Sequence, residues 1–313
     1  MFDVGRSSFK RSPYGINATR LQNNLALMGH RPLLEDKMYR VVRRDEIVPN
    51  VHIIEIEAPA IAEKARPGQF VLIMPDETGE RVPFSMSDWN IEKGTITVFF
   101  LEVGISTARM ARIESGGALF SVSGPLGKPT RIDKFGSVVC GGGCYGIGAV
   151  YPVARAMKKA GNKVTTIIEA RSAYLIYLEE QLKEVSDKVL VGTADGSRGS
   201  KGMVPDVLTE LVQNGEKIDR SYFIGCTFMM MNCSNITKPY NIKTLVALNP
   251  IMVDGTGMCG CCRVTVGGET RFACVDGPEF DGHQVDWEEI FKRKSIYLEN
   301  EAMAYQNYRC QES

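Results

Sequence analysis

The stretch 136–170, "GSVVCGGGCYGIGAVYPVARAMKKAGNKVTTIIEA", constrains the fold more than any other part of the chain. It reads as a strand, a glycine loop, a helix that stops at Gly161-Asn162, and a second strand. This order predicts a βαβ unit, and such a crossover joins parallel strands. The alternation continues through "KVLVGTAD", a helix near 204–213, "SYFIGC" and "KTLVALN". We therefore expect a parallel α/β domain over 133–248.

The glycine loop of this unit is typical of nucleotide binding. Glycines between a buried strand and a helix let backbone N–H groups approach a phosphate, and the helix N-terminus stabilises its charge. The spacing is not G-x-G-x-x-G, which argues against an ordinary dehydrogenase loop. A tight turn at 141–143 without a ligand is the alternative.

The segment 37–132 has the sequence pattern of a β domain. "HIIEIEAP" alternates Ile54 and Ile56 with Glu55 and Glu57, and "GQFVLIMP" and "TITVFFLEV" follow with turns between them. Strands at this spacing predict a small antiparallel barrel. His52, in the first of these runs, is interpreted as a surface residue.

Composition narrows the class of protein. A chain of 313 residues suits two or three domains, and 44% apolar residues indicate globular folding. The zero formal net charge gives no sign of nucleic-acid binding. Because no signal peptide and no apolar run of 18 residues are visible, we expect a cytoplasmic protein without a membrane partner. An N-terminal extension over 1–36, with a short helix capped by Asn17, and a helical tail over 291–313 are expected to pack or dock.

A cysteine-rich module is expected over 249–290. "VDGTGMCGCCRV" holds three cysteines in four positions, and Cys274 follows. The adjacent Cys261 and Cys262 argue against simple disulfide bridging, so reduced thiols and a metal centre are favoured. Zinc on Cys259, Cys261, Cys262 and Cys274 has suitable donors, although three ligands in four residues strain a tetrahedron.

Two barrel segments are candidates for binding a flat ring and a pyrophosphate. "RVPFSMS" places an aromatic residue beside hydroxyl groups, and "LEVGISTARM" and then "GPLG" follow. Gly104, Ser106 and Thr107 stand at an expected helix start, where N–H groups suit a pyrophosphate. For Phe84, a place in the barrel core is the alternative.

The order of these pieces resembles the ferredoxin–NADP reductase superfamily over about 37–245. The pieces are x-P-F-S and G-x-S-T in a barrel, then G-G-G and a late "FIGCTFMM" in a sheet domain. With the cysteine module, the chain resembles the electron-transfer subunit of dihydroorotate dehydrogenase. It is most similar to the small subunit of the NADH-dependent ferredoxin–NADP oxidoreductases, or sulfide dehydrogenase small subunit. "LNPIMVDGTGMCGCCRVTVGGETRFACVDGPEFDGHQVDW" is specific to that group, and the resemblance covers about 37–292.

The resemblance implies FAD in the barrel. The residues implied to contact FAD are Pro83, Phe84, Ser85 and Leu101 at the isoalloxazine and Gly104, Ser106 and Thr107 at the pyrophosphate. Many relatives have Arg directly before the Pro-aromatic-Ser step, where this chain has Val82. Arg81 stands one position early and should point elsewhere.

The resemblance also implies NAD(H) or NADP(H) on the sheet domain. The residues implied to contact it are Gly142, Gly143, Gly146, Arg171 and Cys226. Cys226 would lie near the nicotinamide, with a small buried hydrophobe as the alternative. Glu169 ends a strand where acids bind ribose hydroxyls, but Arg171 and Ser172 equally suit a 2′-phosphate, so NADH and NADPH are not distinguished.

For the cysteine module, the resemblance implies a [2Fe–2S] cluster. Relatives bind it through C-x4-C-x2-C and a later Cys. Here Asp254 stands where the first Cys is expected, so the implied ligands are Asp254, Cys259, Cys262 and Cys274, and Cys261 should point away. A ligand set that uses Cys261, and Asp254 as a plain Asp-Gly turn residue, remain alternatives.

The implied function is electron transfer between NAD(P)H, FAD and the cluster. Hydride transfer needs no acid–base side chain, which fits a chain with only three histidines. The partner implied is a larger flavin/iron–sulfur subunit. Electron bifurcation and ferredoxin as a further partner are consistent with it. The alternatives are the dihydroorotate dehydrogenase electron-transfer subunit, which predicts Cys at 254, and a zinc-stabilised nucleotide-binding regulator.

Overall fold

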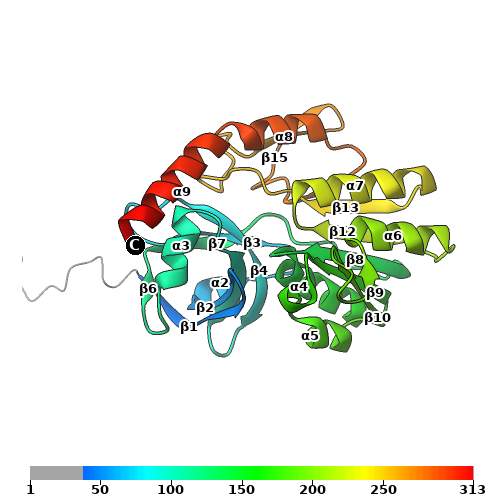
Figure 1. The fold of residues 1–313 in the computed structure, drawn as a ribbon, viewed down its shortest axis with the longest axis horizontal. Helices are drawn as coiled ribbons and strands as arrows, with labels where there is room; N and C mark the ends of the chain where they lie inside the picture. The colour runs from blue at the N-terminus through cyan, green and yellow to red at the C-terminus, as the bar shows by residue number, and fades with distance from the viewer. Residues whose placement is uncertain (1–37, 313) are drawn as a thin grey trace, which may run out of the picture. The chain divides into compact units, whose positions relative to one another are not determined.

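A curled antiparallel sheet forms the first part of the chain that the computed structural model describes, residues 38–312 (Figure 1). Its strand order is β6-β1-β2-β5-β4-β3-β7. Its elements are β1 (Tyr39–Val48), β2 (Val51–Glu57), α2 (Pro59–Ala62), β3 (Phe70–Met74), β4 (Val82–Asn90), β5 (Thr95–Leu101), α3 (Ile105–Arg112), β6 (Ala118–Leu119) and β7 (Ser121–Leu126). Ile54 and Ile56 are fully buried in its core, so the predicted barrel-like domain is confirmed. The helix expected around Asn17 lies outside the described residues.

His52 is buried, and its interpretation as a surface residue is wrong. Only 4% of it is exposed, and its ring stacks on Phe100 with 5.1 Å between the centroids. Its Nε2 lies 3.3 Å from a carboxylate oxygen of Glu102. In a strand, residues two apart share a face, so the alternation that turns Ile54 inward turns His52 inward as well.

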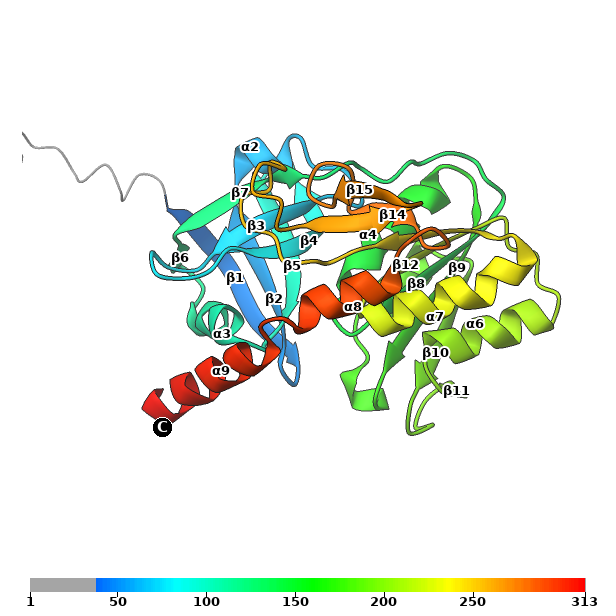
Figure 2. The same ribbon diagram turned by 90° about the horizontal axis from the view of Figure 1, so that it is seen from above.

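A second seven-stranded sheet follows, in the order β11-β10-β9-β8-β12-β13-β16. Its elements are β8 (Ser137–Gly143), α4 (Gly146–Lys159), β9 (Lys163–Ala170), α5 (Glu179–Glu184), β10 (Lys188–Thr193), β11 (Ser200–Lys201), α6 (Val204–Gln213), β12 (Arg220–Ile224), α7 (Thr227–Thr237) and β13 (Lys243–Ala247), with 3₁₀ turns at Ala173–Leu175 and Lys238–Tyr240. The pairs among these strands are all parallel, as the βαβ pattern predicts. Helices α4 and α5 cover one face and α6 and α7 the other (Figures 1 and 2).

The cysteine-rich segment is built onto this sheet. Its elements are the hairpin β14 (Arg263–Val266) and β15 (Glu269–Phe272), then β16 (Glu279–Asp281), α8 (Trp287–Ser295) and α9 (Leu298–Glu312). Strand β16 pairs antiparallel with β13 and so becomes the last strand of the sheet. Sequence reasoning missed this strand, because three residues are too few for a visible alternation. The expected helical tail is confirmed.

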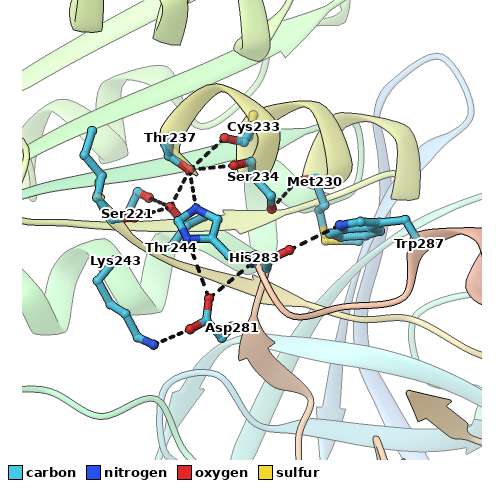
Figure 3. Close-up of polar contacts among 12 residues, drawn as sticks. Ser221, Met230, Cys233, Ser234, Thr237, Lys243, Thr244, Asp281, His283 and Trp287 are labelled. Carbon is cyan, nitrogen blue, oxygen red and sulfur yellow. Dashed lines mark hydrogen bonds and ion pairs between the residues drawn. The ribbon is translucent and has the colours of Figure 1, made fainter. Parts of the chain in front are cut away.

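A buried polar network fastens this segment to the sheet (Figure 3). Thr237, at the end of α7, lies 2.9 Å through its Oγ1 from Nε2 of His283. The Thr244 hydroxyl donates to the same Oγ1 at 2.7 Å, and Ser221 lies 2.9 Å from Thr244. Burial lowers the pKa of His283, so the ring is neutral near pH 7. One threonine hydroxyl thus joins α7, β13 and the loop after β16.

Helix α4 packs against the barrel, and this contact sets the sheet domain beside β4 and β5. A Cβ on Gly148 would lie 2.5 Å from Cδ2 of Phe99, so only glycine permits this approach. Arg155 donates to Asp88 at 2.7 Å and lies 5.7 Å from the centre of the Trp89 ring.

Within residues 38–312, no helix is long and apolar enough to cross a membrane.

We expect Thr237→Val to lower the free energy of unfolding by about 1–3 kcal/mol, because the shape is kept while His283 loses its hydrogen bond. Thr209→Val is the matched control, since that hydroxyl also donates to the carbonyl four residues earlier but faces no second element. Urea unfolding followed by circular dichroism measures both. Equal losses in the two variants would show that the network does not stabilise the fold.

Candidate flavin, nucleotide and cluster site

Strand β4 carries the Pro-Phe-Ser step, and its two faces have different surroundings. Phe84 points into the barrel core, where it is 9% exposed and packs edge-on against Phe100 at 6.0 Å. Because successive side chains alternate, Pro83 and Ser85 lie on the opposite face, and both are half-buried. The structure therefore favours the alternative interpretation of Phe84 as a core residue. Pro83 and Ser85 remain available to a ligand.

The cysteine loop, residues 253–262, lies against this same outer face of the barrel. Phe70 and Leu72 stand opposite Ser85 and Pro83 in the β3–β4 ladder, so they share that face. They pack in one apolar cluster with cysteines of the loop. A Cβ on Gly255 would lie 2.6 Å from a methyl group of Leu126 and 3.0 Å from one of Leu72. The expected flavin face and the expected cluster loop are thus direct neighbours.

Helix α3 begins where the pyrophosphate is expected, next to Leu101 at the end of β5. The Thr107 hydroxyl accepts from the N–H groups of Val103 and Gly104, at 3.0 Å each, and is itself buried. It therefore holds the loop rather than facing solvent. A Cβ on Gly104 would meet nothing within 4 Å, so the helix start is open. Its first N–H groups, including that of Ser106, have no partner inside the helix and are oriented to bind an anion.

The three glycines of the β8–α4 turn permit close packing at the carboxyl end of the sheet. A Cβ on Gly146 would lie 1.9 Å from the carbonyl oxygen of Ile224. One on Gly142 would lie 2.7 Å from the carbonyl oxygen of Gly146, and one on Gly143 would lie 2.2 Å from a carboxylate oxygen of Glu169. These contacts hold the turn tightly against β9 and β12, at the edge where open α/β sheets bind nucleotides.

Two residues at the end of β9, Glu169 within the strand and Arg171 just after it, are candidates for contact with the nucleotide's ribose or phosphate, and their surroundings differ. Glu169 is 3% exposed and accepts from the backbone N–H of Val204 at 2.5 Å, at the start of α6. Burial raises its pKa. Glu169 therefore serves the contact between β9 and α6, whereas Arg171 is exposed at the sheet edge.

Cys226 is exposed, so its interpretation as a small buried hydrophobe is wrong. It follows β12 as the residue that caps α7, and its Sγ accepts from the N–H of Met229 at 3.4 Å. The strand end and the helix start leave the thiol at the carboxyl edge of the sheet, where the nicotinamide was expected.

Sequence reasoning missed a polar chain that reaches this edge from the C-terminal segment. Lys294 of α8 donates to Thr227 at 3.1 Å and to Asn249 at 3.0 Å. Asn249 donates to the Tyr145 hydroxyl at 2.5 Å, which donates to the carbonyl of Gly225 at 2.9 Å. Burial lowers the pKa of Lys294. No local pattern distinguishes this lysine from the other basic residues in "WEEIFKRKS".

Cys262, at the end of the cysteine loop, and Cys274, just after the hairpin β14–β15, are brought together. Both are 1% exposed, and their Sγ atoms lie 3.2 Å apart. Burial, with the neighbouring Cys262 thiol, raises the pKa of Cys274 to about 12. Cys259 is exposed, and its N–H donates to Asp254 at 2.8 Å, as does that of Thr256 at 2.9 Å. The Thr256 N–H, with that of Cys259, lowers the pKa of Asp254 to about 2.

Cys261, the thiol not expected to bind the cluster, is half-buried. A hydrogen bond with Cys259 raises the pKa of the Cys261 thiol, and its carbonyl accepts from Arg293 of α8 at 2.9 Å. Among residues 38–312, no three His, Cys, Asp or Glu side chains are already gathered to hold a metal ion. The donor set nevertheless suits iron, because two adjacent buried sulfurs, Cys262 and Cys274, flank the hairpin β14–β15 and the ionised carboxylate of Asp254 lies in the glycine-rich loop before it.

We expect Gly146→Ala to lower the free energy of unfolding by about 1–3 kcal/mol, because its Cβ would overlap the Ile224 carbonyl and α4 must shift. Gly104→Ala, which meets open space, is the control and should cost less than about 1 kcal/mol, because only the preference of an N-cap for glycine over alanine is lost. Thermal and urea unfolding of both variants measure this. A Gly146→Ala protein as stable as the control would contradict the tight turn.

Comparison with known proteins agrees with this geometry. A sequence model of the iron–sulfur cluster binding domain of dihydroorotate dehydrogenase B matches residues 249–286. A homologue of the dihydroorotate dehydrogenase B (NAD⁺) electron-transfer subunit from Thermotoga maritima is 42% identical over 268 residues, which cover 86% of this chain and 94% of the relative. The electron-transfer subunit itself from Desulforamulus reducens is 31% identical over 252 residues, covering 77% and 95%.

A solved structure is similar over nearly the whole described chain. It comes from work on flavin-based electron bifurcation via the NADH-dependent reduced ferredoxin–NADP oxidoreductase. The TM-score is 0.81 at 42% identity, over 90% of this chain and 99% of that one. The chain therefore belongs to the family of the dihydroorotate dehydrogenase B electron-transfer subunits and their homologues.

Proposed function

We propose that this chain is an electron-transfer subunit that binds FAD and a [2Fe–2S] cluster and exchanges electrons between NAD(P)H and a larger flavin/iron–sulfur partner. One observation carries the proposal. The cysteine loop packs on the barrel face that bears Pro83 and Ser85, through the contact of Gly255 with Leu72 and Leu126. Two redox groups bound at these places would be neighbours within one chain.

FAD fits the barrel through residues of two kinds. Pro83, Ser85 and Leu101 offer a half-buried surface for a flat ring, with Phe84 supporting it from the core. The N–H groups at the start of α3, beside Gly104 and Ser106, suit the pyrophosphate, and Thr107 holds their loop in place. When bound, FAD accepts the two electrons of a hydride and releases them one at a time.

The nicotinamide nucleotide is the substrate proposed for the carboxyl edge of the second sheet. Gly142, Gly143 and Gly146 keep the β8–α4 turn close to that edge, and Arg171 supplies an exposed cation. Cys226 would lie beside the nicotinamide. This site would need no general acid or base, because the chemistry that bound FAD would supply is the acceptance of a hydride.

The cluster ligands we propose are Asp254, Cys259, Cys262 and Cys274. Thiolates are soft donors that suit iron, and the buried pair Cys262 and Cys274 is already in contact. Asp254 is ionised at neutral pH and lies beside Cys259, so it can supply an oxygen ligand after its hydrogen bonds rearrange. Glycines 255, 257 and 260 all have positive φ angles, which let the loop wrap closely.

Two relatives suggest different partners for this subunit. The dihydroorotate dehydrogenase electron-transfer subunit is a second candidate function, but that function predicts a Cys where this chain has Asp254. Similarity to the NADH-dependent ferredoxin–NADP oxidoreductase structure favours a larger flavin/iron–sulfur subunit and electron bifurcation. A zinc-stabilised regulator without redox turnover is the remaining alternative.

The test is a measurement on the anaerobically purified protein. We expect one FAD and two irons per chain, and bleaching of the flavin absorption when NADH or NADPH is added. One zinc per chain, with no flavin absorption, would instead establish the regulator. The subunits that co-purify distinguish the two oxidoreductase functions.

The ligand set is tested by a matched pair of variants. Cys261→Ala should keep two irons per chain, while Cys262→Ala should lose them, because only the second residue is proposed to bind iron. Iron content and the electron paramagnetic resonance spectrum of the reduced protein measure this. Loss of iron in Cys261→Ala would show that the wrong thiol was chosen.

Asp254→Cys should keep the cluster but change its spectrum and reduction potential, since a thiolate replaces an oxygen donor. Potentiometric titration gives the potential of both proteins. If potential and spectrum are the same as in the unmodified chain, Asp254 is a turn residue and not a ligand.

A further inference from the structure

Two exposed cysteines follow neighbouring strands of the second sheet at its carboxyl edge. Cys144 comes directly after β8, and Cys226 comes after β12 with one glycine between. These strands pair in parallel, and Gly142 lies opposite Ile224 at the end of their ladder. Each cysteine stands two residues beyond that pair. The two thiols therefore leave the sheet at the same point.

The two backbones stay close after the ladder ends. A Cβ on Gly225 would lie 3.3 Å from both the nitrogen and the carbonyl oxygen of Gly143, so the residues directly before the two cysteines adjoin. Neighbouring strands lie about 4.8 Å apart, and a disulfide joins residues whose Cα atoms are about 4.4–6.8 Å apart. The spacing of these two turns therefore suits a disulfide between Cys144 and Cys226.

Two tyrosines hold the turns that carry the thiols. The Tyr177 hydroxyl donates to the carbonyl of Cys144 at 2.7 Å, and the Tyr145 hydroxyl donates to the carbonyl of Gly225 at 2.9 Å. Cys226 is held further as the cap of α7. Because both turns are fixed, neither thiol has to be carried in from a distant loop before the two can react.

The thiols also interact electrostatically. Partial loss of water contact raises the pKa of the Cys144 thiol, the charges of Glu169 and of Cys226 raise this pKa further, and Arg171 lowers it. Such an effect of one thiol on another requires that the two groups are near each other, since the interaction weakens with distance. The other two groups belong to the edge where the nucleotide is proposed to bind.

The backbone of Cys144 is strained, and its packing does not explain why. Its φ is +50°, in the left-handed region. A residue with a Cβ loses about 1–2 kcal/mol in this region, whereas glycine does not. The turn "GGGCYG" uses glycine at the positions around it. Because Cys144 is exposed, no core contact requires its side chain, and strain of this kind points to a functional role for the thiol.

We propose that Cys144 and Cys226 are a reversible thiol–disulfide pair that controls access of the nicotinamide nucleotide to the sheet edge. The pair itself follows from the geometry of the two turns. The control rests on the proposed function, in which Cys226 lies beside the nicotinamide. A disulfide would bridge β8 and β12 at the place where that ring would lie.

The oxidant we propose is a low-molecular-weight disulfide such as oxidised glutathione. One cysteine thiolate attacks a sulfur of this disulfide, the S–S bond of the oxidant breaks, and one small thiol leaves. The second cysteine then attacks the mixed disulfide, and the second small thiol leaves as the protein disulfide forms. Two electrons pass from the protein thiols to the oxidant, and the two protons end on the released thiols.

Peptide mapping of the full chain, with its cofactors bound and after anaerobic treatment with oxidised glutathione, tests the pair. We expect a peptide that links Cys144 to Cys226, and no glutathione on either residue. Cys144→Gly should instead keep one glutathione on Cys226, because no second thiol displaces it. Glycine suits the positive φ, so this variant should fold. Cys310→Ser, which removes an exposed cysteine of α9, is the matched control and should still form the link.

The control of nucleotide access is tested on the same samples by the rate at which NADH or NADPH bleaches the flavin. We expect the rate of the unmodified chain to fall about 10- to 100-fold when the link forms, because the nicotinamide is displaced from the flavin. Dithiothreitol should restore it. Iron content is measured alongside and should stay constant, which separates this effect from loss of the cluster. Saturating NAD⁺ or NADP⁺ should slow formation of the link.

Glutathione left on Cys226 of the unmodified chain, or no reaction at either cysteine, would show that the two thiols do not pair. A link that leaves the bleaching rate unchanged, or that forms equally fast with bound nucleotide, would overturn the control of access. If neither nucleotide bleaches the flavin before oxidation, the proposed function fails and the control of access fails with it. The peptide map still decides in that case whether the thiols pair.

Discussion

The close approach of Gly255 to Leu72 and Leu126 is the contact on which the proposed electron path depends. A side chain at Gly255 would meet those methyl groups at 2.6–3.0 Å, so any other residue would push the cysteine loop off the barrel. The φ of +75° at this position also favours glycine. The cysteine loop and the surface formed by Pro83 and Ser85 share one face of the barrel. The packing of this single loop therefore sets the distance between the two proposed redox groups.

Two further contacts place the nucleotide edge beside the same face. Gly148 lets α4 pack on Phe99, and the Arg155–Asp88 ion pair closes the edge of that interface. The Thr237–His283 hydrogen bond and the pairing of β16 with β13 hold the cysteine segment on the sheet. The barrel, the sheet and the cysteine segment are thus joined pairwise.

Sequence patterns predicted those parts of the fold that rest on local periodicity. Alternation in β2 identified Ile54 and Ile56 as core, and the glycine loop between strand and helix identified the βαβ unit. The same alternation places His52 on the inner face, because it is two residues before Ile54. Its polarity alone suggests the surface, but stacking on Phe100 and the contact with Glu102 satisfy the buried ring.

What the sequence could not predict depends on contacts between distant segments. Pairing with β3 and β5 decides which side of β4 faces outward. It therefore also decides that Phe84 lies in the core. Lys294 reaches Asn249 across 45 residues, and α9 reaches α3 across nearly 200, with no local pattern to mark either. For the cluster, the resemblance implies Asp254 and the cysteines as ligands, but the contact between the Cys262 and Cys274 sulfurs appears only in three dimensions.

The most direct test of the central claim is anomalous scattering at the iron edge from a crystal of the anaerobically prepared protein. We predict two iron positions within bonding distance of Asp254, Cys259, Cys262 and Cys274, beside the outer face of β3 and next to a flavin ring on β4. A single metal with a zinc edge, or irons separated from the flavin by the barrel wall, would contradict the account.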